Sequence, residues 1–210
     1  MNPFRYLVHT ILLVVATQAP ASEMEHPVLL PFTDDAAMAA GIGLLKETPL
    51  AENSSEIRIW IGFGLVVPEK MLRFRRDSRG VVSGQVFVKF PSDLGYMSSN
   101  DAADLRREIM RNCRDLRKGK KSDVCTATFA HEPNWQSLYK KLVALGLTTL
   151  PDESTLPEPE FEGNDGIAMV VEIRNGAAYR AYEYSNPILR DGPEAAAAVK
   201  IISTVNNAIH

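Results

Sequence analysis

The sequence predicts an α+β fold: one mostly antiparallel sheet of about six strands, with about three helices packed on one face. Residues 56–67 alternate between apolar and mostly polar positions, as expected for a strand with one buried face. Asn175-Gly176 separates two further runs of strand-like pattern, and Asn-Gly is typical of a tight hairpin turn. Apolar stripes at helical spacing elsewhere in the chain predict the helices.

The register of the hairpin follows if Asn175 and Gly176 are its two turn residues. Val171 then faces Arg180, and Met169 faces Tyr182. A slip of one residue would move every side chain to the opposite face, so we expect the register to be strongly fixed.

The remaining elements follow from local patterns along the chain. Two short strands after residue 67 are close enough in sequence to continue an antiparallel meander. A serine can cap a helix that runs to about Lys118, and a strand follows it. Two later helices carry apolar stripes and are opened by prolines. The expected ranges are strands at 71–76, 81–90 and 123–130 and helices from Ser98 or Ser99 to Lys118, from 133 to 146 and from 191 to 209.

The N-terminus has the pattern of a secretory signal peptide over residues 1–21. Arg5 precedes an apolar run at residues 7–16, and Ala19-Pro20-Ala21 is a small-residue cleavage site. The alternative, an uncleaved membrane anchor, needs an apolar run about twice as long. We expect a partly ordered arm over residues 22–55, with one short helix at 36–45, and a single α+β domain over residues 56–210.

Composition places the chain among ordinary globular proteins. It has 210 residues, of which 45% are hydrophobic and 23% charged, and a formal net charge of −3. No later run is long and apolar enough to span a bilayer. No nucleic-acid-binding motif accompanies the basic residues, so no nucleic acid partner is expected.

Cys113 and Cys125 are the two cysteines of the chain. In an exported protein such a pair predicts a disulfide; two buried thiols are the alternative. Their spacing is not that of a redox motif, and two cysteines are too few for a cysteine-built zinc site.

Basic residues gather on one side of the helix expected up to Lys118. Arg107, Arg111, Arg114 and Lys118 share that face. They could bind an anionic surface such as lipid headgroups. A solvated helix face, partly offset by neighbouring acidic residues, is the alternative.

A second candidate binding region combines strand and hairpin residues. Gly62 and Gly64 lie beside Trp60 on one side of the first strand, where glycines indicate either a bulge or the close approach of a ligand. Arg180 shares the apolar side of the hairpin with Tyr182. It either packs at the margin of that face with its head paired to a carboxylate, or grips an anion in a groove lined by tyrosines.

Catalytic signals are weak. Ser137 and Lys140 match S-x-x-K without the companion motifs of penicillin-recognising enzymes. The segments that carry the few histidines supply too few ligands for a metal site. We therefore expect no metal and no cofactor, and favour a protein that is not an enzyme.

The second half of the chain resembles a group of small exported proteobacterial proteins of unknown function. The resemblance rests on the two cysteines, on Glu132-Pro133-x-Trp135, on Asp165-Gly166, on Tyr179-Arg180-x-Tyr182 and on Asn186-Pro187. It implies export and a Cys113–Cys125 bridge, and it brings no activity, cofactor or partner.

These observations predict an exported soluble protein, periplasmic or secreted, that acts by binding. Its partner would be a protein or an anionic envelope component, contacted through a sheet face, a strand edge or the basic helix face. A small-ligand or hydrolytic site near Trp60, Gly62, Gly64 and Arg180 is the alternative.

Overall fold

The computed structural model describes residues 27–63, 69–91, 98–119, 122–129, 131–158 and 166–209. The predicted signal peptide lies outside these ranges. In order, the elements are α1 (Leu30–Ala39), β1 (Ser55–Gly62), β2 (Glu69–Arg76), β3 (Val82–Pro91), α2 (Ser99–Asn112), β4 (Cys113–Lys118), β5 (Ser122–Ala127), α3 (Trp135–Ala144), β6 (Ala168–Asn175), β7 (Ala178–Ser185) and α4 (Pro193–Ala208). Three short 3₁₀ helices join them: η1 (Leu45–Glu47), η2 (Glu153–Thr155) and η3 (Pro187–Leu189).

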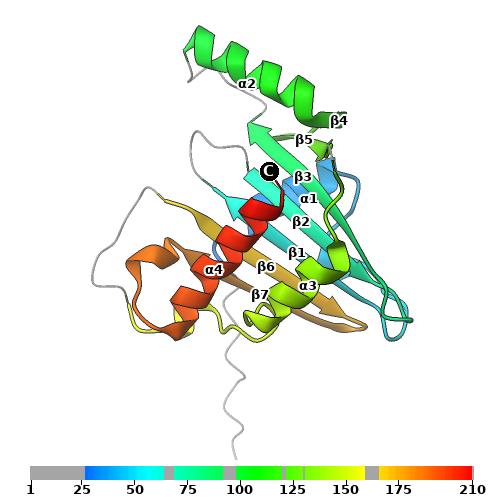
Figure 1. Ribbon diagram of the computed structural model, residues 1–210, viewed down its shortest axis with the longest axis vertical. Helices are drawn as coiled ribbons and strands as arrows, with labels where there is room; N and C mark the ends of the chain where they lie inside the picture. Colours follow the sequence, from blue (N-terminus) through cyan, green and yellow to red (C-terminus); the bar gives the residue numbers. More distant parts are fainter. Residues whose placement is uncertain are drawn as a thin grey trace, which may run out of the picture.

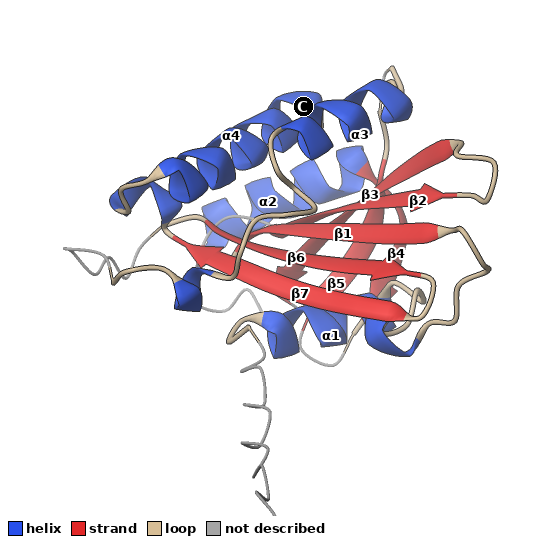
Figure 2. Cartoon of the chain, turned by 90° about the horizontal axis from the view of Figure 1, so that it is seen from below, coloured by secondary structure: helices blue, strands red, loops and turns tan. Residues whose placement is uncertain are grey.

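The strands form one antiparallel sheet in the order β4-β5-β3-β2-β1-β6-β7. The predicted α+β class is therefore confirmed. The described residues form seven strands in place of about six and four α-helices in place of about three. The expectation that all helices share one face is wrong. Figure 2 shows α3 and α4 on one side of the sheet and α1 on the opposite side.

The main core lies between the sheet and helices α3 and α4 (Figure 1). Leu138 and Leu142 of α3 and Ala198 and Ile202 of α4 are buried against it, as the apolar stripes predict. Asn134 caps α3 by accepting a hydrogen bond from Ser137 N. This face of the sheet is apolar because alternate residues of each strand, among them Ile57, Ile59, Leu72, Phe74, Met169 and Val171, point toward the helices.

The opposite face carries a smaller core under α1. Trp60 and Met71 of the sheet pack there with Ala36 and Ala37 of the helix. An apolar row on this face must be covered by something, and α1 covers it. The short helix expected at residues 36–45 lies at Leu30–Ala39 instead, so part of the expected N-terminal arm is a packed element of the domain.

The β6–β7 hairpin forms, but its register differs from the predicted one by two residues. Val171 faces Tyr182 and Met169 faces Tyr184. The two turn residues are Gly176 and Ala177, because Asn175 pairs with Ala178 and Gly176 takes the positive φ of 56°. A shift of two leaves each side chain on its predicted face, since side-chain direction repeats every second residue.

The helix predicted to run to Lys118 ends at Asn112. Residues Cys113–Lys118 form β4 instead, which pairs with β5 through Arg114↔Thr126 and Lys118↔Asp123. Leu116, expected on the buried stripe, is 46% exposed. Pairing with β5 satisfies the backbone of this segment, so tertiary contact overrides local helical propensity.

Candidate functional site

Two rows of polar side chains cross the α1 face of the sheet beyond the part that α1 covers. Cα pairing places Arg174, Glu56, Arg75 and Ser83 side by side in one row. The next row contains Glu172, Arg58, Arg73 and Gln85. Residues paired in this way share a face of the sheet and their side chains can interact.

Glu56 is the centre of these rows. Its carboxylate is fully buried and accepts two hydrogen bonds from Arg73, at 2.8 and 2.9 Å. Nε of Arg58 donates to it at 2.8 Å, and Nε of Arg75 lies 3.1 Å from it. Three guanidinium groups therefore surround one carboxylate. Glu172, paired with Arg58, is the other carboxylate of these rows, so positive charge remains in excess.

The three arginines differ in what else they face. Arg58 is fully buried, and its terminal nitrogens donate to the carbonyl oxygens of Ile42 and Gly43. Arg73 is almost buried, whereas the side chain of Arg75 is 55% exposed. The excess positive charge is therefore directed toward the open side of Arg73 and Arg75.

The environment of Glu56 sets its ionisation. Burial alone would raise the pKa of its carboxyl, but hydrogen bonds and charges from Arg73 and Arg58 outweigh that effect and hold the pKa below its usual 4.5. Glu56 therefore remains a carboxylate throughout the neutral range and holds the arginines in place.

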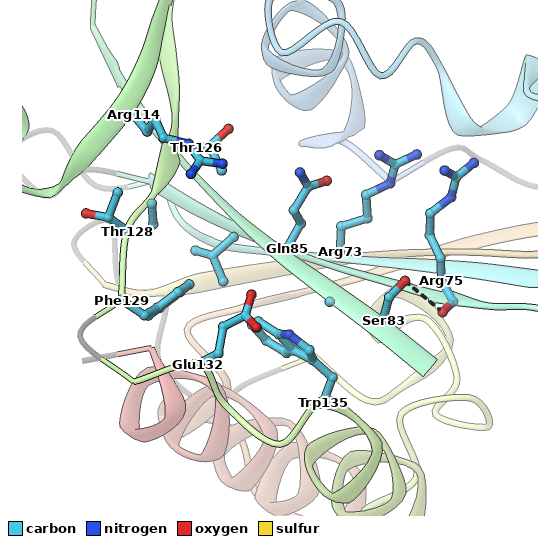
Figure 3. Close-up of a pocket in the computed structure, with 13 residues that line it drawn as sticks. Arg73, Arg75, Ser83, Gln85, Arg114, Thr126, Thr128, Phe129, Glu132 and Trp135 are labelled. Atoms are coloured by element: carbon cyan, nitrogen blue, oxygen red, sulfur yellow. Dashed lines mark hydrogen bonds between the residues drawn. The ribbon is translucent and has the colours of Figure 1, made fainter. Parts of the chain in front are cut away.

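Arg73 and Arg75 line a cleft of about 610 Å³ at the β5 side of β3. We call it the arginine cleft. Figure 3 shows its two walls on opposite sides of the β3 ribbon. The cationic wall consists of Arg73, Arg75, Ser83, Gln85, Arg114 and Thr126, and the aromatic wall of Phe129, Glu132 and Trp135.

Gly84 separates the two walls. A Cβ placed on this residue would lie 2.2 Å from two ring carbons of Trp135, so the indole ring can pack here only against a glycine. Trp135 also contacts Phe74 and Phe129 edge to face, with ring centroids 6.3 and 6.0 Å apart. The aromatic wall is thus fixed to the main core.

The cleft offers groups that can hold an anion. Guanidinium groups and an amide side chain can hold a carboxylate, phosphate or sulfate through paired hydrogen bonds. Among the described residues that line the cleft there is no histidine or cysteine. The Ser83 hydroxyl donates to the Arg75 carbonyl oxygen at 3.4 Å.

A second cavity, of about 590 Å³, is acidic and lies at the outer edge of β7. Asp152 accepts a hydrogen bond from Glu183 N, and Glu153 accepts one from Ser185 N, at 2.9 and 2.8 Å. Burial raises the pKa of Glu153, although the Ser185 amide and Arg190 oppose the shift. These carboxylates are occupied in capping the strand edge.

The structure places Trp60 and Arg180 on opposite faces of the sheet, so they cannot share one site. Trp60 is buried under α1 and its indole N–H donates to Glu172 at 2.9 Å. Gly62 ends β1 with a φ of 129°, and Gly64 lies outside the described residues. Among the described residues, the buried Trp60 ring therefore offers no exposed surface to a ligand.

Arg180 bonds to groups within the fold. Its guanidinium lies 5.0 Å from the ring centroid of Tyr182 and donates to the carbonyl oxygen of Thr148. Tyr182 is fully buried and its hydroxyl donates to Leu147 O at 2.7 Å. The partner of Arg180 is therefore a carbonyl group and an aromatic ring, in place of the expected carboxylate, and Tyr182 lines no open groove.

The four predicted basic residues do not share a helix face. Arg107 and Arg111 lie on α2, whereas Arg114 and Lys118 lie on β4. All four are exposed. Of the four, Arg114 lines the arginine cleft.

The predicted Cys113–Cys125 disulfide is confirmed, with 5.4 Å between the two Cα atoms. It links β4 to β5, next to the cationic wall.

Sequence reasoning missed Glu56, Arg73, Arg75 and Gln85 as site residues. The signal was present in the alternation of β1 and β2, which turns Glu56 and Arg58 away from the main core and does the same for Arg73. Placing these residues together also required the strand register.

Family models, curated proteins and solved structures were all compared with the chain, and none of them matches it. Among the residues that the structure describes, no helix is long and apolar enough to cross a membrane. Within the same ranges, no group of three or more histidine, cysteine, aspartate or glutamate side chains is placed to hold a metal ion.

Proposed function

We propose that this is an exported binding protein, periplasmic or secreted, whose ligand presents an anionic group to the cleft between Arg73, Arg75 and Arg114. The observation that carries the proposal is the excess of cations around Glu56. Glu56 is shared by three arginines, and Glu172 lies beside one of them, Arg58. The positive charge that is not balanced is therefore on Arg73 and Arg75, which line the cleft.

The fixed geometry favours binding over a merely solvated basic surface. Arg73 is held by two hydrogen bonds to a buried carboxylate, so little side-chain entropy remains to be lost when an anion binds. Arg107 and Arg111 on α2 are exposed. Long exposed side chains lose more conformational entropy when they bind an anion.

Export is part of the proposal and rests on two features of the chain. The first is the signal-peptide pattern of residues 1–21. The second is the disulfide, which is typical of proteins that fold in an oxidising compartment.

The test of the proposed function is an NMR titration of the full chain, exported by a bacterial host, with the dicarboxylate glutarate. We expect the Nε–Hε signals of Arg73 and Arg75 to shift together along one saturating curve. Arg75→Gln should weaken this binding, because it removes one of the cationic side chains of the cleft.

The matched control is Arg79→Gln. Arg79 is an exposed arginine of the β2–β3 turn, paired with Asp77, and it does not line the cleft, so this variant makes the same charge change outside the cleft. If glutarate shifts exposed arginines as much as Arg73 and Arg75, or if both variants weaken binding equally, the cleft is not an anion site.

A further inference from the structure

The edge of β3 is open where it borders the arginine cleft. β5 pairs with β3 from Phe87 to Pro91, while β2 pairs with β3 along residues 82–89. Residues 82–86 therefore have a strand partner on one side, and the cleft lies on the other. An unpaired strand edge presents amide and carbonyl groups to which another extended chain can bond.

Hydrogen bonds at the β2–β3 turn show which backbone groups face the cleft. Asp77 N donates to Val81 O, so Val81 faces β2, as Ser83 and Gln85 do after it. Val82, Gly84 and Val86 then turn their backbone groups toward the opposite edge. Val82 N confirms this direction, because it donates to the Gln136 side chain at 3.2 Å. Among the described residues, no hydrogen bond from the cleft side reaches the Gly84 backbone.

The two outer edges of the sheet, at β7 and β4, are protected against pairing with another strand. On β7, the amides of Glu183 and Ser185 donate to Asp152 and Glu153, which blocks that edge. On β4, most side chains are charged and exposed, and charged side chains also discourage pairing. Gly84 is thus a backbone position left open beside two fixed walls.

The two walls would contact alternate side chains of a strand added at this edge. A residue paired opposite Gly84 points its side chain to the Trp135 side, and its two neighbours, opposite Ser83 and Gln85, point to the arginine side. Arg73 and Arg75 favour acidic side chains on their wall. Glu132 on the aromatic wall disfavours an acidic side chain there (Figure 3).

We propose that the cleft binds an extended peptide segment with the order acidic–apolar–acidic, which adds a short strand to β3 at Gly84. The inference rests on the proposed function and names its ligand class. A cavity of about 610 Å³ has the volume of a small-ligand site, enough for a few residues of an extended chain. Main-chain bonds to Gly84 supply pairing, and the alternation of the walls supplies specificity.

The test uses a fluorescent, end-blocked peptide of order Thr-Glu-Val-Glu-Thr, titrated against the exported full chain by anisotropy. We expect binding that weakens about tenfold when the valine amide is N-methylated, because one strand hydrogen bond is lost and the methyl group blocks approach. A scrambled Glu-Glu-Val-Thr-Thr peptide should bind about tenfold more weakly as well. Arg75→Gln should weaken the parent peptide, and Arg79→Gln should leave it unchanged.

The outcomes separate this inference from the proposed function. Equal binding of the N-methylated and parent peptides overturns strand pairing, and equal binding of the scrambled peptide overturns the alternation. Binding of glutarate without any binding of the parent peptide also overturns the inference and leaves the anion site intact. If glutarate fails at Arg73 and Arg75 as well, the proposed function fails with it.

Discussion

The two faces of the sheet are built on different principles. The face under α3 and α4 is mostly apolar, and most of its apolar side chains are buried in one core. The face under α1 is apolar along one row and charged along the next two. The first face supplies most of the apolar burial that drives folding. The second carries the proposed binding cleft and keeps buried charge, which costs stability.

Glu56→Gln is expected to have the largest effect on stability, and it tests the charged face of the sheet. Removing this carboxylate leaves Arg58 fully buried and Arg73 nearly so without their shared counter-charge. Breaking a buried ion pair on one side costs about 3–5 kcal/mol. Denaturant unfolding of the oxidised protein measures the change in free energy of unfolding.

Asp104→Asn is the control for that variant, because it makes the same carboxylate-to-amide change in an exposed pair with Arg107. Its expected effect is below about 1 kcal/mol. Comparable losses in the two variants would mean that the charged rows contribute no special stability, and that the two faces differ less than their burial implies.

The apolar face is tested by Leu142→Ala. Leu142 is fully buried between α3 and the sheet, and truncation of such a leucine costs about 2–5 kcal/mol through lost burial and the cavity left behind. Lys141→Ala, at the exposed neighbouring position, is the control in the same unfolding assay. Binding of glutarate by the folded Leu142→Ala protein should stay unchanged, because Arg73 and Arg75, which hold the anion, lie on the other face of the sheet.

The disulfide affects one end of the sheet. Replacing both Cys113 and Cys125 by serine removes the covalent link between β4 and β5. The separation of 12 residues corresponds to about 2–3 kcal/mol of loop entropy, which is the expected decrease in the free energy of unfolding. Unfolding in guanidinium with and without reductant measures this loss for the native chain. A double variant as stable as the oxidised protein would mean that β4 pairs with β5 equally well without the bridge.

The apolar face could be predicted from the sequence to a large extent, because it rests on local patterns. The stripe of α3, with Leu138 and Leu142 buried, and the alternation of β1 are visible at their own spacing. Helix α2 was predicted too long because Cys113–Lys118 pairs with a strand, a contact that its local spacing does not encode.

The charged face could be predicted only in part. The alternation of β2 predicts that Arg73 and Leu72 point to opposite faces of the sheet. The contact between Arg73 and Glu56 depends on how β1 pairs with β2, and therefore on the register. Trp60 was predicted as a possible ligand shelf because nothing local to β1 indicates that α1 covers it. The covering helix lies in a segment that the sequence predicts as a partly ordered arm.

The smallest expected effect concerns two carboxylates on the charged face whose pKa values shift in opposite directions. Burial raises the pKa of Glu172 above 4.5, and hydrogen bonding from Trp60 and the charge of Arg58 offset only part of that rise. The pKa of Glu56 is lowered. Glu56 therefore contributes stability that is present above pH 4.5 and is lost as pH falls through its folded pKa.

Glu172 has the opposite sign. Between pH 4.5 and its raised folded pKa, the folded state binds more protons than the unfolded state, so the free energy of unfolding falls as pH rises through this window. Glu172→Gln keeps an acceptor for the Trp60 indole and removes the titration. The difference in unfolding free energy between variant and native protein should therefore grow in favour of the variant from pH 4.5 upward. A difference that stays constant with pH would mean that folding does not shift the pKa of Glu172, and a difference that changes in favour of the native protein as pH rises toward 4.5 would place Glu172 with Glu56.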